Sequence, residues 1–287
     1  MQTEIISFKA KDGINLDGIW YKSGSKKVLI QIHGMTSNCF KKRDKVISKK
    51  VQEIGIDTIC FNNRGSDVIR YIKTDEESYL GGMAYEDIEE SHNDIIGAIE
   101  YALSLGYEDI YLQGHSLGCT KIVYTHHKLV KENSYLLDKI KGIILLSLVD
   151  IPSIEKADLK EEYMKYAEEK EKACKTMEMM PLESYVHPIS VKTFLRYTKY
   201  NQNIDFARFG DEEDNFEVLN EIKCPIFIRW GNVNEIIKQD AGELADFMNK
   251  KIKNTEKDIS YIDGADHGYF EKEEQLACEI KKFLEMR

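Results

Sequence analysis

The sequence has no cysteine pattern typical of a structural metal site or of a disulfide framework. Its 6 cysteines are scattered singly, without a C-x-x-C pair or a neighbouring histidine at zinc-ligand spacing, so we expect free thiols and no metal. Free thiols are typical of the reducing cytoplasm, the compartment that we predict for the chain. The first residues lack the basic and apolar regions of a signal peptide, and the sequence predicts neither export nor membrane insertion.

The chain is also poor in proline, and its positive charges are outnumbered by negative ones. Only 4 residues are proline and 42% are hydrophobic, which is typical of a folded globular protein. The formal net charge of −10 disfavours attraction to nucleic acid and to anionic membranes, so neither is an expected partner. One basic run, at 41–50, departs from this balance. A local anion site is the alternative, but we predict that the run is the solvated face of a helix and assign it no function. Nothing in the sequence indicates an oligomeric state.

Short β-branched runs alternate with longer segments of helical period, which predicts an α/β fold with helices on both faces of a mostly parallel sheet. The runs 5–9 and 16–21, separated by Asp12-Gly13, predict an antiparallel hairpin. A helix is expected from 84 to 105, because apolar residues recur there at helical spacing and Gly106 follows. Six continuous apolar runs predict buried strands at 28–32, 56–61, 110–113, 143–149, 226–230 and 259–262. With the two strands of the hairpin, eight strands are expected.

The interval between the strands 143–149 and 226–230 is too long for one crossover helix and predicts an insertion. Residues 154–180, rich in Glu, Lys, Ala and Met, are expected to be helical, and Pro181 and Pro188 interrupt them. We therefore predict a core of residues 1–150 and 216–287 and a helical cap at 151–215. Four methionines of the cap are expected to fill its core or, alternatively, to line an acyl pocket: Met164, Met177, Met179 and Met180.

A G-x-S-x-G pentapeptide, 114–118, lies between the strand 110–113 and an apolar helical segment. In this context the motif is typical of a sharp strand-to-helix turn that holds a serine in a strained conformation with its hydroxyl exposed. Glycines on both sides leave room for the crowded backbone. Ser116 is therefore the candidate nucleophile, and a purely structural glycine-serine turn is the alternative.

Serine is a weak nucleophile at neutral pH and needs an adjacent base. His267 lies directly after the last predicted strand, among small residues that suit a loop at the carboxyl end of the sheet. It is the candidate base, and a surface-loop histidine is the alternative.

The carbonyl oxygen of a substrate gains negative charge when it is attacked, so two backbone N–H donors are needed nearby. Leu117 is expected to supply one of them. Met35, in the loop His33-Gly34-Met35 after the strand 28–32, is expected to supply the other, with Gly34 permitting a close approach. His33 is expected to be structural, and a buried turn without a catalytic role is the alternative for this loop.

Together these features resemble the α/β-hydrolase superfamily across the whole chain. The resemblance rests on the initial hairpin, on His33-Gly34, on the pentapeptide 114–118, on the late insertion and on Asp266-His267-Gly268. Residues 81–87 and 113–118 are similar to a branch that includes fungal siderophore-esterase-like proteins. The resemblance implies an α/β-hydrolase fold, with an eight-stranded sheet and a helical cap inserted after strand 6, and a serine hydrolase activity.

The family's third triad member departs from the pattern here. The resemblance implies an acid after the seventh strand in a Gly-x-x-Asp turn, and this chain has Asn234 at that position. An amide can orient the imidazole but cannot stabilise imidazolium by charge. Glu235 is one candidate acid, Asp150 at the end of the sixth strand is another, and the third possibility is that no carboxylate serves.

These observations predict hydrolysis of an ester or related acyl bond in a small molecule, through an acyl-serine intermediate and without a cofactor. Acyl transfer or thioester cleavage by the same nucleophile is the second hypothesis, because an acyl-enzyme can react with an alcohol, an amine or water. A binding protein that kept the fold after losing its acid is the third, and Asn234 is its motivation.

Overall fold

The computed structural model of the chain describes residues 2–151, 160–199, 204–209 and 211–286. An eight-stranded sheet lies at its centre in the order β1-β2-β4-β3-β7-β8-β9-β10. The pairs β1–β2 and β2–β4 are antiparallel and the others are parallel. All eight predicted strands are confirmed, as is the fold class. The strands are β1 (Gln2–Lys9), β2 (Asn15–Lys22), β3 (Lys27–Ile32), β4 (Ile56–Phe61), β7 (Asp109–His115), β8 (Ile140–Leu146), β9 (Ile226–Gly231) and β10 (Lys257–Ile262).

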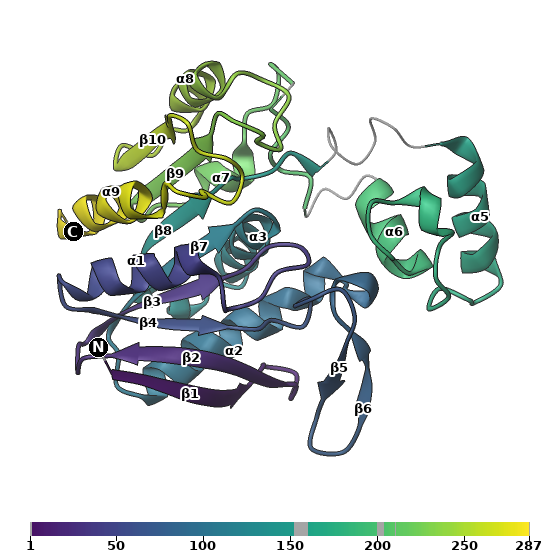
Figure 1. Cartoon of the computed structure of the whole chain (residues 1–287), viewed down its shortest axis with the longest axis horizontal. Helices are drawn as coiled ribbons and strands as arrows, with labels where there is room; N and C mark the ends of the chain where they lie inside the picture. Colours follow the sequence, from purple (N-terminus) through teal and green to yellow (C-terminus); the bar gives the residue numbers. More distant parts are fainter. Residues whose placement is uncertain (1, 152–159, 200–203, 210, 287) are drawn as a thin grey trace.

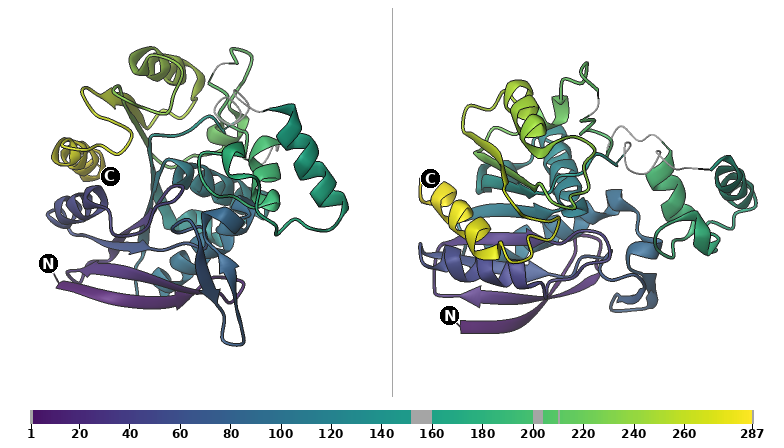
Figure 2. Two further views of the ribbon diagram at one scale, coloured as in Figure 1. Left: turned by 45° about the vertical axis from the view of Figure 1, so that its right-hand side comes forward. Right: turned by 45° about the horizontal axis from the view of Figure 1, so that its top comes forward.

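Both faces of the sheet are covered by helices, as the continuous apolar runs predict. In β3, Val28 and Ile30 face one buried cluster, while Leu29 faces a second cluster on the opposite side, because successive strand residues point to opposite faces. The first cluster includes residues of α2 (Ser91–Ser104), α3 (Leu117–Lys131) and α8 (Ala241–Lys251). The second includes α1 (Lys42–Gln52) and α9 (Glu273–Glu285), which lie side by side in Figures 1 and 2. None of the described helices has both the length and the apolar character that a bilayer span requires.

The α-helix predicted at 84–105 begins at Ser91 instead, after two short 3₁₀ turns at Met83–Tyr85 and Ile88–Glu90. Two acidic residues between these turns have extended backbones that interrupt the helix. Glu86 forms an ion pair with Lys121 of α3, and both side chains are fully buried. Asp87 accepts a hydrogen bond from the backbone N–H of Glu89. The polar roles of these two side chains therefore outweigh the helical period of their apolar neighbours.

A second, two-stranded sheet lies apart from the main one. It pairs β5 (Arg70–Lys73) with β6 (Ser78–Gly81) in antiparallel register. Both strands are four residues long and mostly exposed, so they lack the apolar run that identifies a buried strand in a sequence.

Helices α5 (Glu161–Lys172) and α6 (Val191–Thr198) occupy the insertion between β8 and β9, and α7 (Glu217–Asn220) follows them. Figure 1 shows α5 and α6 beyond the carboxyl ends of the parallel strands, on the side away from both termini. A third buried cluster joins them to the core, since it includes Leu117 and Val149 together with Ala167 and Phe194. The boundaries of the proposed cap, at 151 and 215, stay predictions.

The helix predicted at 154–180 is shorter than expected. Its residues 154–159 lie outside the described residues, and α5 ends at Lys172. Cys174 adopts a left-handed conformation with φ 57°, and the N–H of Lys175 donates to the carbonyl of Lys170. This pattern terminates a helix by satisfying its last carbonyls.

Candidate active site

Ser116 occupies a strained turn between β7 and α3. Its φ is 55° and its ψ is −127°, a conformation that costs free energy for a non-glycine residue. A Cβ atom on Gly118 would lie 2.4 Å from the carbonyl oxygen of Ile32, and one on Gly114 would lie 2.6 Å from the nitrogen of Cys119. Larger residues are therefore excluded on both sides of Ser116, as the motif predicts.

The loop after β3 approaches this turn closely. A Cβ atom on Gly34 would lie 2.8 Å from the Cβ of Ser116, so only glycine allows the contact. Across the described ranges, neither the Met35 N–H nor the Leu117 N–H donates to a protein acceptor. These two donors are the ones expected for a substrate oxyanion.

His33 fixes the peptide between Gly34 and Met35. Its Nδ1 lies 2.9 Å from the carbonyl oxygen of Gly34, and its Nε2 lies 3.2 Å from the N–H of Asn63. These contacts assign the proton to Nδ1, which donates, while Nε2 accepts. Burial, with a contribution from Lys121, lowers the pKa of His33 to about 3. His33 is therefore a neutral structural group, as predicted, and orients the Gly34–Met35 peptide.

Glu235 and His267 are in contact: the Nδ1 of His267 hydrogen-bonds to Oε1 of the Glu235 carboxylate. Three further donors hold the carboxylate, whose side chain is 3% exposed. They are the backbone N–H of Gly231 at 2.9 Å, the Ser147 hydroxyl at 2.7 Å and the backbone N–H of Ile236 at 2.9 Å. Glu235 is thus fixed with one oxygen directed at the imidazole.

The hydrogen bonds around Glu235 favour its ionised form. Burial by itself would raise the pKa of this carboxyl. The hydrogen bond from His267, the charge of His267 and the hydrogen bonds from Ser147 and Gly231 together lower the pKa below 4.5. The carboxylate is therefore charged at neutral pH, where it can stabilise imidazolium at His267.

Asn234 adopts a left-handed conformation with φ 50°, which asparagine tolerates better than most residues. The chain thus turns at the position where the family carries its acid, and the next residue, Glu235, reaches the imidazole. Asp150, the other candidate, is buried and accepts a hydrogen bond from the backbone N–H of Phe209 at 2.7 Å. The geometry favours Glu235 over Asp150 as the partner of His267.

His115, inside the pentapeptide, also contacts the histidine loop. Its Nε2 lies 2.7 Å from the carbonyl oxygen of His267, and the two rings are 4.9 Å apart. Burial and the nearby Arg43 hold the pKa of His115 well below 6.5, so the ring is neutral and donates this hydrogen bond from Nε2. Sequence reasoning missed the contact, because the motif leaves this position unspecified.

Ser116 and His267 line the same two cavities, together with Met35 and Thr36. Within the described part of the chain, no hydrogen bond joins the Ser116 hydroxyl to the imidazole. In enzymes without substrate such contacts are often long and shorten in the reacting complex. The two residues therefore share a space in which a substrate could lie between them.

The first of these cavities, of about 330 Å³, is mainly apolar. The insertion supplies part of its wall, and none of the four methionines predicted for an acyl pocket lines it. Its other lining residues are Leu117, Val149, Ile151, Tyr185, Val186, His187, Tyr197 and Ile236.

The second cavity, of about 420 Å³, shares Ser116 with the first and carries basic residues. Part of the basic run 41–50 lines it, which the sequence did not indicate. Its other lining residues are Gly34, Ser37, Lys41, Lys42, Arg43, His115, Gly268, Phe270 and Glu273.

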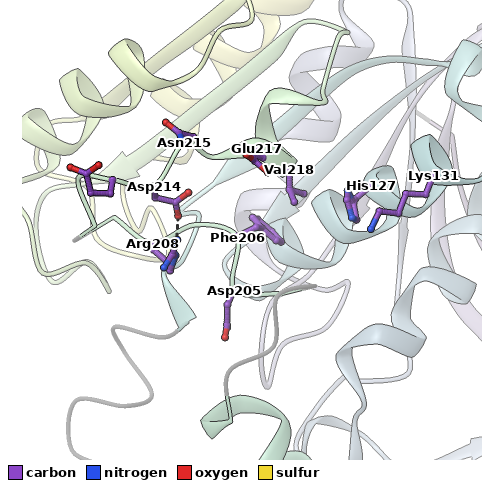
Figure 3. A pocket seen from close by; sticks show the side chains of 10 residues that line it. His127, Lys131, Asp205, Phe206, Arg208, Asp214, Asn215, Glu217 and Val218 are labelled. Atoms are coloured by element: carbon purple, nitrogen blue, oxygen red, sulfur yellow. Dashed lines mark hydrogen bonds and ion pairs between the residues drawn. The ribbon is translucent and has the colours of Figure 1, made fainter.

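A third cavity, of about 450 Å³, lies near the opposite end of α3, where His127 and Lys131 line it (Figure 3). Since Ser116 precedes the first residue of this helix, the two sites are separated by roughly 20 Å of helix. In the third cavity Arg208 forms ion pairs with Asp211 and Asp214, and His127 contacts Glu221. Among the residues that the structure describes, no group of three or more His, Cys, Asp or Glu side chains could hold a metal ion.

Comparisons with known proteins agree with the fold. No family model and no curated protein sequence matches the chain. Among solved structures, Est1E from Butyrivibrio proteoclasticus with bound ferulic acid is 20% identical, with a TM-score of 0.68 over 96% of this chain and 97% of that one. The α/β-hydrolase GrgF from Penicillium is 14% identical, with a TM-score of 0.70 over 100% and 99%. An esterase from Pyrococcus furiosus is 16% identical, with a TM-score of 0.61 over 99% and 91%. These likenesses confirm the expected resemblance at the level of the fold, and the finer placement near siderophore-esterase-like proteins stays a prediction.

Proposed function

We propose that this chain, which has the α/β-hydrolase fold, is a serine hydrolase that cleaves a carboxylic ester or a related acyl bond. Ser116 is the nucleophile, His267 the general base and Glu235 the acid in this proposal. The observation that carries it is the convergence of Ser116 and His267 on shared cavities, with the ionised Glu235 behind the imidazole.

Each group has a defined part in the first half of the reaction. The Ser116 hydroxyl attacks the substrate carbonyl carbon while its proton passes to Nε2 of His267. The carbonyl electrons move to the oxygen, which accepts hydrogen bonds from the Met35 and Leu117 N–H groups. When the carbonyl forms again, the bond to the leaving group breaks and the leaving group takes the proton from His267. Ser116 is then acylated.

Water completes the cycle. His267 accepts a proton from a water molecule as that water attacks the acyl carbon. Collapse of the second tetrahedral intermediate breaks the bond to Ser116, which regains a proton from His267, and the carboxylic acid is released. Glu235 stays ionised throughout and stabilises the positive imidazole.

The apolar cavity supports a hydrophobic acyl group. Leu117, Val149, Ile151 and Tyr197 in its wall are buried apolar side chains, and each methylene of a bound acyl chain that leaves water there contributes about 0.8 kcal/mol. Chain-length preference among p-nitrophenyl esters is therefore expected to rise with length until the cavity is full.

A binding protein without catalysis is less well supported. Asn234 motivated that hypothesis, and the contact between Glu235 and His267 supplies the carboxylate that Asn234 lacks. Four donors converge on this single buried carboxylate, an arrangement that a binding role alone would not require.

The test is labelling with a fluorophosphonate probe, which reacts with activated serine nucleophiles. The wild-type protein is expected to be labelled, and Ser116→Ala is not. Ser104→Ala is a matched control, because it removes an exposed hydroxyl that bonds only to the Tyr101 carbonyl of its own helix and leaves Ser116 in place; labelling is expected to persist. Wild-type protein that stays unlabelled while a control hydrolase reacts would overturn the proposal.

A further inference from the structure

We propose that the substrate is asymmetric: an apolar acyl group lies in the cavity beside Leu117, and a leaving group with a negative charge lies in the cavity beside Lys41. The inference rests on the proposed function and adds a substrate class to it. It starts from the different chemistry of the two cavities that meet at Ser116.

Lys41 carries the charge argument. Three basic residues line the second cavity, and two of them are compensated. Lys42 forms an ion pair with Glu273 at 3.0 Å, and Arg43 makes two hydrogen bonds to the carboxylate of Asp44, at 2.9 and 3.1 Å. Over the described residues, Lys41 has no anionic partner. It is the positive charge that remains for a ligand.

The overall charge of the chain does not cancel this local effect. The formal net charge of −10 repels anions at long range, but at physiological ionic strength charges beyond about 8 Å are largely screened. An anion inside the cavity therefore responds mainly to Lys41 and to the two compensated pairs beside it.

The solvent exposure of the residues that line the two cavities indicates which cavity holds the acyl group and which holds the leaving group. Among the residues that line only one of the two cavities, four of the basic cavity are exposed, Lys41, Lys42, Gly268 and Phe270, against two of the apolar cavity, Val186 and Ile236. In the proposed mechanism the leaving group departs first, and water then reaches the acyl-enzyme. The more exposed basic side suits departure and entry, and the less exposed apolar side suits an acyl group that stays until the end.

Two matched chromogenic esters test the inference. The butyrate ester of 4-hydroxy-3-nitrobenzoate has an anionic leaving group, and that of 4-hydroxy-3-nitrobenzamide has a neutral one of similar size. Each kcat/KM is divided by the rate of hydroxide-catalysed hydrolysis to remove intrinsic reactivity. For the wild type, we expect the anionic ester to be favoured about two- to fivefold at low salt, the range of an exposed charge pair.

Substitutions of lysine identify the charge responsible. The preference is expected to fall to about one in Lys41→Gln and to reverse in Lys41→Glu. Lys49→Gln removes the same charge about 12 Å away, in the helix α1 that directly follows Lys41, and should keep the wild-type preference. Added salt should reduce the preference of the wild type.

The possible outcomes separate this inference from the proposed function. Turnover of both esters with equal normalised kcat/KM in the wild type and Lys41→Glu would overturn the asymmetric substrate and leave the hydrolase intact. No turnover of either ester, together with an unlabelled Ser116, would overturn the hydrolase itself. A third pair, p-nitrophenyl monoadipate and p-nitrophenyl hexanoate, places the charge on the acyl side. A Lys41-dependent preference for the adipate would overturn the assignment of the two cavities.

Discussion

Glu235 contacts the His267 imidazole, Ser116 lines two cavities together with it, and the chain holds these two residues very differently. Four donors hold the buried Glu235 carboxylate, whereas Ser116 opens onto two cavities and has no hydrogen bond to His267 within the described ranges. In the proposed triad the acid and base are thus arranged before a substrate binds, and the contact with the nucleophile is left to form in the complex with substrate. Disturbing one side at a time tests this division.

The largest effect on kcat is expected from a change at Glu235, the residue that four donors hold in place. Glu235→Gln keeps the shape of the side chain and removes its charge, so imidazolium loses its stabilisation. We expect kcat to fall by up to about 10⁴-fold, the effect of such an exchange in a Ser-His-Asp triad. Steady-state kinetics on p-nitrophenyl butyrate measures it. Asp150→Asn is the control, because an amide oxygen can still accept from the Phe209 N–H, and a larger loss in that variant would refute the assignment of the acid.

The next largest effect on kcat is expected beside Ser116, in the loop that carries Gly34. Gly34→Ala brings a Cβ atom within 2.8 Å of the Ser116 Cβ, so the loop that carries the Met35 N–H must move. Loss of one oxyanion donor lowers kcat by about 10²- to 10³-fold. Kinetics and the melting temperature are measured together, since wild-type kcat in a folded variant would contradict the role of this loop.

A smaller effect on kcat is expected from the loss of the contact between His115 and the loop of His267. His115→Leu removes the hydrogen bond to the His267 carbonyl, and the loss of about 1 kcal/mol of positioning should lower kcat about fivefold with little change in KM. His115→Gln keeps a donor and is expected to recover part of kcat. If the two variants behave alike, His115 acts through packing rather than through this hydrogen bond.

The smallest effect is on stability and depends on pH. The folded state holds the pKa of Glu235 below 4.5, so the ionised group contributes stability above the unfolded pKa, which is lost as pH falls through the folded pKa. The melting temperature of Glu235→Gln should therefore lie furthest below that of the wild type near neutral pH, and the gap should narrow in acid. A gap that widens in acid would show that Glu235 is not held as a carboxylate.

The sequence identifies what depends on local pattern. Buried strands are visible as continuous apolar runs, and the turn at Ser116 is visible because its glycines and flanking elements are contiguous. Glu235 is adjacent to the position where the family places its acid, so it could be named as a candidate, although only the fold distinguishes it from Asp150.

What the sequence does not indicate depends on contacts between distant segments. The helix start at Ser91 follows from the ion pair of Glu86 with Lys121 in another helix. The hydrogen bond from His115 to the His267 loop and the position of Lys41 beside Ser116 likewise appear only when separate segments meet. Residue type and spacing carry no signal for such contacts.

The most direct test of the central claim is mass spectrometry of the protein quenched during turnover of a slowly deacylated ester. The account predicts a mass increase equal to the acyl group less one hydrogen on the peptide that contains Ser116, present in the wild type and absent in Ser116→Ala. Turnover with no acylated peptide, or with the acyl group on another residue, would contradict it.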